Sequence, residues 1–379
     1  MGEYLIYDND ALSVSPSVQS ITVAKSVAVI KKAAFKDCIH LTEVLIHDGV
    51  EVIGDDAFHG CTSLASISTP PSVKVVGEGA FGHCTQLRTI VLNDGLEDIG
   101  SQAFIGCIAL QHITIPSTVE FLPIAVFENS GLRSIDLGNG LVEMEEEAFR
   151  GAAELRTVTI PASCRYVGEA AFKGLLNLRE VTFEGSNVSI DAYAFSGCTS
   201  LRTLTMMTTT NDDNDDDDDD EDDNHNRNDE PFIGESAFEN CTMLRDVSLG
   251  NCCVEIRDQA FERCSSLEKL NIPPGVLNIG DEAFAFATSL REVTLWAGLQ
   301  SMGECVFFNC TSLEGIDFPW TMDKIPFRTF SGCVNLCSVT LCEGLLSIND
   351  LAFEGCPVTR SSIAMPSTVT HISSIAFGY

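Results

Sequence analysis

The sequence predicts an elongated solenoid of about fifteen repeats, each made of one short parallel strand and one short helical or 3₁₀ turn. The first observation is a phenylalanine that returns every 23 residues, apart from single spacings of 22, 24 and 43. The second is that other apolar residues keep fixed distances from it, over almost all of the 379 residues. The marker residues are Phe35, Phe58, Phe81, Phe104, Phe127, Phe149, Phe172, Phe195, Phe238, Phe261, Phe284, Phe307, Phe330, Phe353 and Phe377.

The strand is predicted from the apolar residues six, nine and eleven positions after the phenylalanine, such as Leu110, Ile113 and Ile115. The last of these positions alternate with polar residues, which is the period of a strand with one buried face. A single unit cannot bury its own apolar face, so the repeats must stack. Strands ~4.8 Å apart then give a rod of roughly 70 Å.

The turn is predicted from the Ala-Phe-x-x-Cys segment, whose apolar residues have helix-like spacing. A glycine and an acid precede it, as in Gly54-Asp55 and Gly280-Asp281. An acid at the start of a short helix accepts hydrogen bonds from free backbone N–H groups. Nine repeats carry this acid. Paired carboxylates can also serve catalysis, but capping explains the position without any chemistry.

A second pattern alternates between neighbouring repeats. Twelve residues after the phenylalanine stands either a proline or a polar, glycine-containing turn such as Asp94-Gly95. The true repeat is therefore a pair of about 46 residues. We expect proline to end the strand because it has no N–H to donate to the ladder. The prolines of this class are Pro70, Pro116, Pro161, Pro273 and Pro319, with Pro366 one residue later.

The combined pattern Ile-Gly-Asp/Glu-x-Ala-Phe-x-x-Cys-x-x-Leu-x-x-Ile-x-Ile-Pro resembles the BspA-like leucine-rich repeat. The resemblance runs from about Ile21 to the end of the chain. It implies a right-handed solenoid of the leucine-rich-repeat type. It also implies a general binding role, since family members with assigned roles are mostly cell-surface proteins that bind host or matrix proteins.

Composition narrows the classes of partner. The chain has 55 acidic and 22 basic residues, a net charge of −33, which disfavours nucleic acid and anionic membranes. The N-terminus lacks the pattern of a secretory signal, and no apolar stretch is long enough for a membrane span. These features predict a cytoplasmic protein, with a cell-surface protein whose leader is missing as the alternative.

Residues 211–230 contain thirteen acids and almost no apolar residue. They account for the long spacing, and we expect them to form a disordered insertion within a single solenoid of residues 1–379. The simplest interpretation is an expanded loop without a role. The alternative is a weak tether for cations or basic peptides.

Ten of the sixteen cysteines stand three residues after the phenylalanine. Ser130, Ala152, Leu175 and Ala287 occupy the same position, so the cysteines are predicted to fill buried space as reduced thiols. No Cys-x-x-Cys pair occurs, and the histidines are scattered. No metal or cofactor site is predicted.

The candidate binding residues form an arginine lane directly after the repeat leucine. Its members are Arg88, Arg133, Arg156, Arg179, Arg202, Arg245 and Arg291. They should stack as a cationic stripe beside the strands. Two interpretations stay open: pairing with neighbouring acids, or docking of an acidic peptide or a carboxylated glycan.

A hydroxyl lane is predicted beside it, at outward positions of the strands. Its members are Thr114, Thr159, Thr182, Thr205, Ser248, Thr294 and Thr340. Together the features favour a non-catalytic scaffold that binds a partner protein along the strand face. A surface adhesin and an enzyme are the competing classes.

Overall fold

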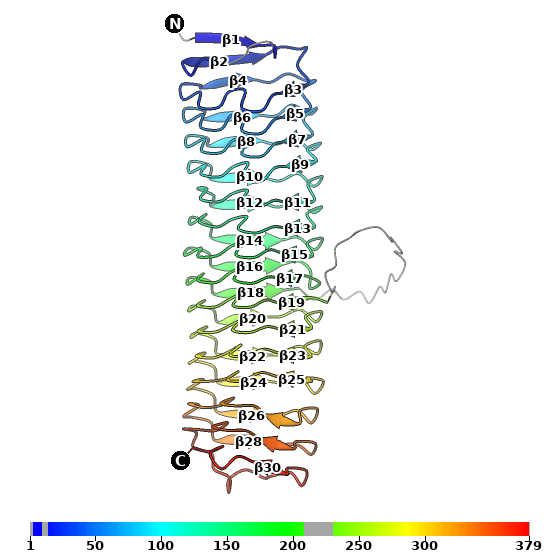
Figure 1. The fold of residues 1–379 in the computed structure, drawn as a ribbon, viewed down its shortest axis with the longest axis vertical. Helices are drawn as coiled ribbons and strands as arrows, with labels where there is room; N and C mark the ends of the chain where they lie inside the picture. The colour runs from blue at the N-terminus through cyan, green and yellow to red at the C-terminus, as the bar shows by residue number, and fades with distance from the viewer. Residues whose placement is uncertain (1–2, 10–13, 208–229, 379) are drawn as a thin grey trace, which may run out of the picture.

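The computed structural model describes residues 3–9, 14–207 and 230–378, which form a nearly straight rod with two parallel columns of strands (Figure 1). The termini lie at opposite ends of the rod. Each repeat between β2 and β29 contributes one strand to each column, and paired strands within a column run parallel. The solenoid prediction is confirmed.

The first column holds the strands that the sequence predicts. They are β1 (Glu3–Tyr7), β2 (Val18–Val23), β4 (Glu43–Leu45), β6 (Ser66–Ser68), β8 (Thr89–Val91), β10 (His112–Thr114), β12 (Ser134–Asp136), β14 (Thr157–Ile160), β16 (Glu180–Phe183), β18 (Thr203–Met206), β20 (Asp246–Ser248), β22 (Lys269–Asn271), β24 (Glu292–Thr294), β26 (Gly315–Asp317) and β28 (Ser338–Thr340). Inward and outward side chains alternate, as in β14, where Val158 and Ile160 are buried. We call the outward side of this column the strand face.

The second column consists of two-residue strands at the apolar position five residues before each phenylalanine. They are β3 (Val29–Ile30), β5 (Val52–Ile53), β7 (Val75–Val76), β9 (Asp98–Ile99), β11 (Phe121–Leu122), β13 (Glu143–Met144), β15 (Tyr166–Val167), β17 (Ser189–Ile190), β19 (Phe232–Ile233), β21 (Glu255–Ile256), β23 (Asn278–Ile279), β25 (Ser301–Met302), β27 (Lys324–Ile325), β29 (Ser347–Ile348) and β30 (His371–Ile372). Two residues are too few to show an alternating pattern, so the sequence did not predict this column.

The core is a continuous stack of the marker phenylalanines. Ring centroids in successive repeats lie between 4.8 Å (Phe149–Phe172) and 5.8 Å (Phe284–Phe307) apart, with the planes close to parallel. At the N-terminal end Tyr7 is buried and packs edge-on against Phe35 at 4.7 Å. Tyr7 therefore takes the place of a phenylalanine and covers the first ring.

The predicted helical turn is wrong, because the described residues contain no helix. The segment around each phenylalanine from Phe35 to Phe353 is a series of turns in which the residues two before and two after it have positive φ, such as Asp56 (54°) and Gly60 (71°). Left-handed backbone cannot continue a right-handed helix. The N–H groups instead point to the next repeat: those of Asp56 and Phe58 donate to Glu78 (2.7 Å) and Ala80 (2.8 Å).

Proline interrupts the first column as the sequence predicts. In a repeat without proline, the N–H of Glu184 donates back to the carbonyl of Ile160 at 2.9 Å. Proline at that position has no N–H. The ladder accordingly breaks immediately before β6, β10, β14 and β22, the strands followed by Pro70, Pro116, Pro161 and Pro273. Between β24 and β26, the strand followed by Pro319, only one pair of residues, Glu292 and Gly315, remains in the ladder.

The solenoid continues in register across the long spacing. Phe195 and Phe238 stack at 5.1 Å, and Ile190 of β17 pairs with Ile233 of β19. Residues 211–229, where disorder is predicted, lie outside the described residues.

Candidate protein-binding face

Each arginine of the lane directly precedes a first-column strand, and all seven are exposed. Backbone hydrogen bonds hold them in line. The N–H groups of Arg179, Arg202 and Arg245 donate to the carbonyls of Arg156 (2.7 Å), Arg179 (2.8 Å) and Arg202 (3.0 Å). The run on consecutive repeats therefore extends past the insertion to Arg245.

Most of the guanidinium groups are free of acidic partners. Arg245 pairs with Glu268 at 3.0 Å, with 63% of its side chain exposed. The other six make no ion pair or side-chain hydrogen bond with any residue that the structure describes. Pairing with neighbouring acids thus explains one member of the lane and leaves six charges available.

The hydroxyl lane lies beside the arginine lane on the strand face. Strand register aligns Thr159, Thr182, Thr205 and Ser248 across β14, β16, β18 and β20. Thr114, Thr294 and Thr340 hold the outward position in β10, β24 and β28. Short polar side chains therefore form the surface between the arginines and the far end of the strands.

Two hollows of the strand face border the arginine lane. One of about 770 Å³ lies between β8 and β10, where the ladder is broken, and Arg88, Val91 and His112 line it. The other, about 430 Å³, lies over β18, β20 and the start of β22 and is lined by Thr205, Arg245, Ser248 and Lys269. Both are open depressions that a partner's surface can fill.

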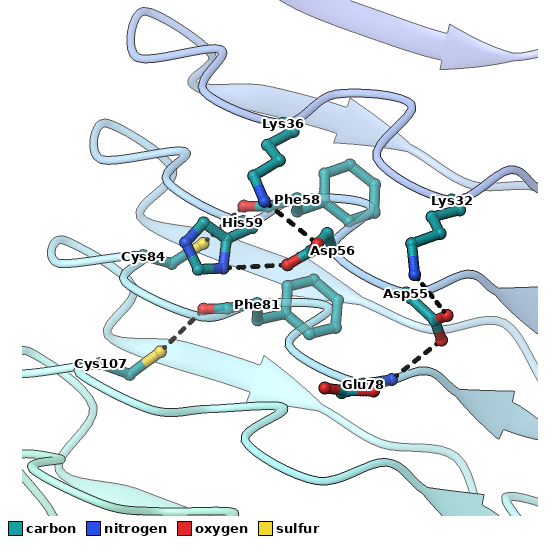
Figure 2. Close-up of polar contacts among 10 residues, drawn as sticks. All are labelled: Lys32, Lys36, Asp55, Asp56, Phe58, His59, Glu78, Phe81, Cys84 and Cys107. Carbon is teal, nitrogen blue, oxygen red and sulfur yellow. Dashed lines mark hydrogen bonds and ion pairs between the residues drawn. The ribbon is translucent and has the colours of Figure 1, made fainter.

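The acidic residues predicted to cap helices serve a different purpose. The carboxylate of Asp55 accepts the N–H of Glu78, the equivalent residue of the next repeat, at 3.2 Å (Figure 2). Asp258 and Asp281 do the same for the N–H groups of Asp281 and Glu304, both at 2.7 Å. They are acceptors for a backbone N–H, as predicted, but they join two repeats.

The same turns carry a cluster of titratable side chains (Figure 2). Lys32 pairs with Asp55 at 3.2 Å and Lys36 with Asp56 at 3.1 Å, while Nδ1 of His59 lies 3.3 Å from Asp56. The cavity beside them measures only about 90 Å³. Within residues 3–9, 14–207 and 230–378, no group of histidine, cysteine and acidic residues could hold a metal ion.

The ladder cysteines do more than fill space. Sγ of Cys84 and of Cys107 lies 3.1 Å from the carbonyl oxygen of Phe58 and of Phe81 in the preceding repeat (Figure 2). All sixteen cysteines carry free thiols. Burial raises the pKa of Cys107 to about 12, so these thiols stay protonated at neutral pH. A thiol held neutral is a hydrogen-bond donor and a poor nucleophile.

In the described part of the chain, no helix is long and apolar enough to cross a membrane.

A family model of repeated units matches most of the chain. A family model described as "BspA type Leucine rich repeat region" matches in six copies, over residues 7–133, 122–215, 228–336 and 254–379. No curated protein matches the chain.

Three solved structures of leucine-rich repeat proteins are similar to this chain, and the first shows the same fold. A leucine-rich repeat protein from Bacteroides ovatus is 22% identical, with 85% of this chain and 83% of that one covered and a TM-score of 0.62. A leucine-rich cell surface protein from Faecalibacterium prausnitzii is 24% identical, covering 91% and 89%, with a TM-score of 0.44. A leucine-rich repeat protein from Eubacterium ventriosum is 18% identical, covering 95% and 90%, with a TM-score of 0.43.

Proposed function

The chain belongs to the BspA-type leucine-rich repeat family, and on that premise we propose that it is a non-catalytic scaffold that binds a partner protein along its strand face. Leucine-rich repeat proteins bind proteins in general. The observation that carries the proposal is that six of the seven lane arginines are exposed and have no acidic partner among the described residues. Arginine is enriched at protein interfaces because its planar group pairs bidentately with carboxylates.

The shape of the strand face supports the proposal. Short polar side chains of the hydroxyl lane cover the outward side of β14 to β20, and open hollows border the arginine lane at Arg88 and Arg245. The titratable cluster at Asp55 and Asp56 gives little support to catalysis, because its carboxylates already pair with lysines and a backbone N–H.

The test compares three forms of the chain as baits for capture from a lysate of the native cells. The lane variant carries Arg156→Gln, Arg179→Gln and Arg202→Gln. The off-lane control carries Arg150→Gln, Arg165→Gln and Lys173→Gln, which are exposed residues outside the strand face with the same change in charge. A protein captured by the wild type and the control but lost with the lane variant supports the proposal. A set of captured proteins that is identical for all three baits contradicts it.

The cellular location is part of the proposal. We propose a cytoplasmic scaffold first and a surface adhesin second, the latter because BspA-type proteins are often found at the cell surface. Biotinylation of intact cells that express the native gene separates the two. Labelling of the chain on unbroken cells would favour the adhesin, and labelling only after lysis would favour the scaffold.

A further inference from the structure

We propose that the element bound by the arginine lane is an acidic α-helix of the partner, laid along the long axis of the solenoid over β14, β16, β18 and β20. This inference rests on the proposed function, because it specifies what kind of partner the strand face takes. Three properties of this stretch support it: its charge, its spacing and its short outward side chains.

Charge selects an acidic partner. Arg156, Arg179 and Arg202 are exposed on three consecutive repeats and make no ion pair within the described chain. Arg245 follows on the next repeat, and its partner Glu268 is itself about half exposed and can exchange. A basic element would meet aligned like charges here, whereas carboxylates meet unpaired guanidinium groups.

Spacing favours a helix over an extended strand. Phenylalanine rings of these four repeats are 4.8, 4.9 and 5.1 Å apart, about 15 Å for three steps. Because the rod is nearly straight, the surface spacing follows the core (Figure 1). Three turns of an α-helix rise about 16 Å, so one acid per turn stays opposite each arginine. In an extended chain every second residue faces the same side, so three such steps span about 20 Å. The fourth acid of an extended chain would therefore lie about one repeat beyond the fourth arginine.

The surface beside the lane accommodates a rod-shaped element. Outward positions of β14 and β18 are threonines: Thr157, Thr159, Thr203 and Thr205. Leu45 and Val91, which are large, apolar and exposed on the strand face, belong to earlier repeats, and Met207 is exposed directly after the end of β18. Binding over the strands themselves is therefore mainly polar and should weaken with salt.

Two acids also project from this stretch and restrict how the helix can lie. Glu180 of β16 and Asp246 of β20 stand one position beyond Arg179 and Arg245, on alternate repeats. Basic residues on the flank of the helix can pair with them, while its acidic stripe faces the arginines. The helix that fits best thus has a row of acids and, beside it, a basic residue at every second turn.

The test uses three synthetic peptides of equal length and charge, with the same number of glutamates. The first is a helix, held by a side-chain cross-link on its far face, with glutamates at i, i+4, i+7 and i+11. The second is the same cross-linked helix with the glutamates spread around it. The third contains proline and has glutamates at every second residue, so it is extended. Fluorescence anisotropy measures each affinity for the full-length wild type, the lane variant and the off-lane control.

We expect the striped helix to bind the wild type and the control with at least about tenfold higher affinity than either other peptide does. The gain comes from a few exposed ion pairs that form together. The lane variant should lose that preference, and circular dichroism should show that it is folded. Equal affinity of the three peptides, or equally tight binding by a polysaccharide of uronic acids, would overturn the helix assignment. Lane-dependent capture of a protein with no preference for the stripe would leave the scaffold proposal standing and reject only the helix.

Discussion

Sγ of Cys84 lies 3.1 Å from the backbone carbonyl oxygen of Phe58, so the thiol joins its repeat to the preceding one. The same contact links Cys198 to Phe172 and Cys333 to Phe307, also at 3.1 Å. Ser130 occupies the equivalent position in another repeat, and its buried hydroxyl has no hydrogen-bond partner. The C–O bond is shorter than C–S, which leaves the serine oxygen short of the carbonyl.

Replacing this thiol should therefore be more harmful with serine than with alanine. Cys84→Ser buries an unpaired hydroxyl, which costs about 1–3 kcal/mol. Cys84→Ala loses only the sulfur's packing and a weak hydrogen bond, because the Phe58 carbonyl keeps its bond from the N–H of Cys61. Urea denaturation measures the free energy of unfolding of both variants, and Cys84→Ser should be the less stable of the two. A serine variant as stable as the wild type would show that the length of the side chain is unimportant here.

Stability should fall at alkaline pH because of the same thiols. Burial raises the pKa of Cys107, Cys198 and Cys310 to about 12 from an ordinary 9.0. The unfolded chain then loses these protons at lower pH than the folded chain does. The stabilisation is complete below pH ~9 and is lost as pH rises toward 12, by about 1.4 kcal/mol per pH unit for each thiol.

The free energy of unfolding, measured from pH 7 to pH 11, checks this effect. In Cys107→Ala the free energy of unfolding should fall less steeply with pH, by the contribution of one thiol, about 1.4 kcal/mol per pH unit. A stability profile that is flat across this range would contradict the buried thiols.

The phenylalanine stack should carry much of the stability. Phe172 lies 4.8 Å from Phe149 and 4.9 Å from Phe195, fully buried. Phe172→Ala leaves a cavity that costs roughly 3–5 kcal/mol. Phe121 of β11 is 50% exposed and serves as the matched control. Equal losses in melting temperature for Phe172→Ala and Phe121→Ala would refute the packing role.

Much of this fold could be predicted because a position that is apolar in repeat after repeat is a buried position. Positions that are phenylalanine in all fifteen repeats, or leucine in twelve of them, must face the common core, and the stack and the first column follow from that. The left-handed backbone at residues such as Ala170 (φ 54°) could not be predicted, since alanine has no preference for it. The N–H of Ala170 donates to the carbonyl of Ala192 in the next repeat at 3.0 Å, and no local sequence pattern reveals such a bond.

The sequence predicts where the lane arginines lie, but it predicts only in part which of them form ion pairs. Counting from the repeat leucine is enough to align Arg156, Arg179 and Arg202. Whether each guanidinium finds an acid depends on side chains one repeat away, as for Arg245 and Glu268. Tyr7 was missed because it lies 28 residues before Phe35, outside the regular spacing.

Deleting residues 211–230 should leave the solenoid folded. Phe195 and Phe238 already stack, and Sγ of Cys241 lies 3.3 Å from the carbonyl oxygen of Phe195 across the junction. The repeats on either side therefore contact each other without help from the segment between them. Circular dichroism and thermal unfolding of the deletion variant check this. Loss of a cooperative transition would show that the segment contributes to the fold.

The central claim is that Arg156, Arg179 and Arg202, which have no acidic partner among the described residues, become covered by the partner protein. Arginine modification with phenylglyoxal, located by mass spectrometry, tests it most directly. Arg156, Arg179 and Arg202 should react readily in the protein alone and be protected once the captured partner is added, while Arg150 and Arg165 react equally in both samples. Slow reaction in the free protein, or reaction that the partner leaves unchanged, would contradict the account.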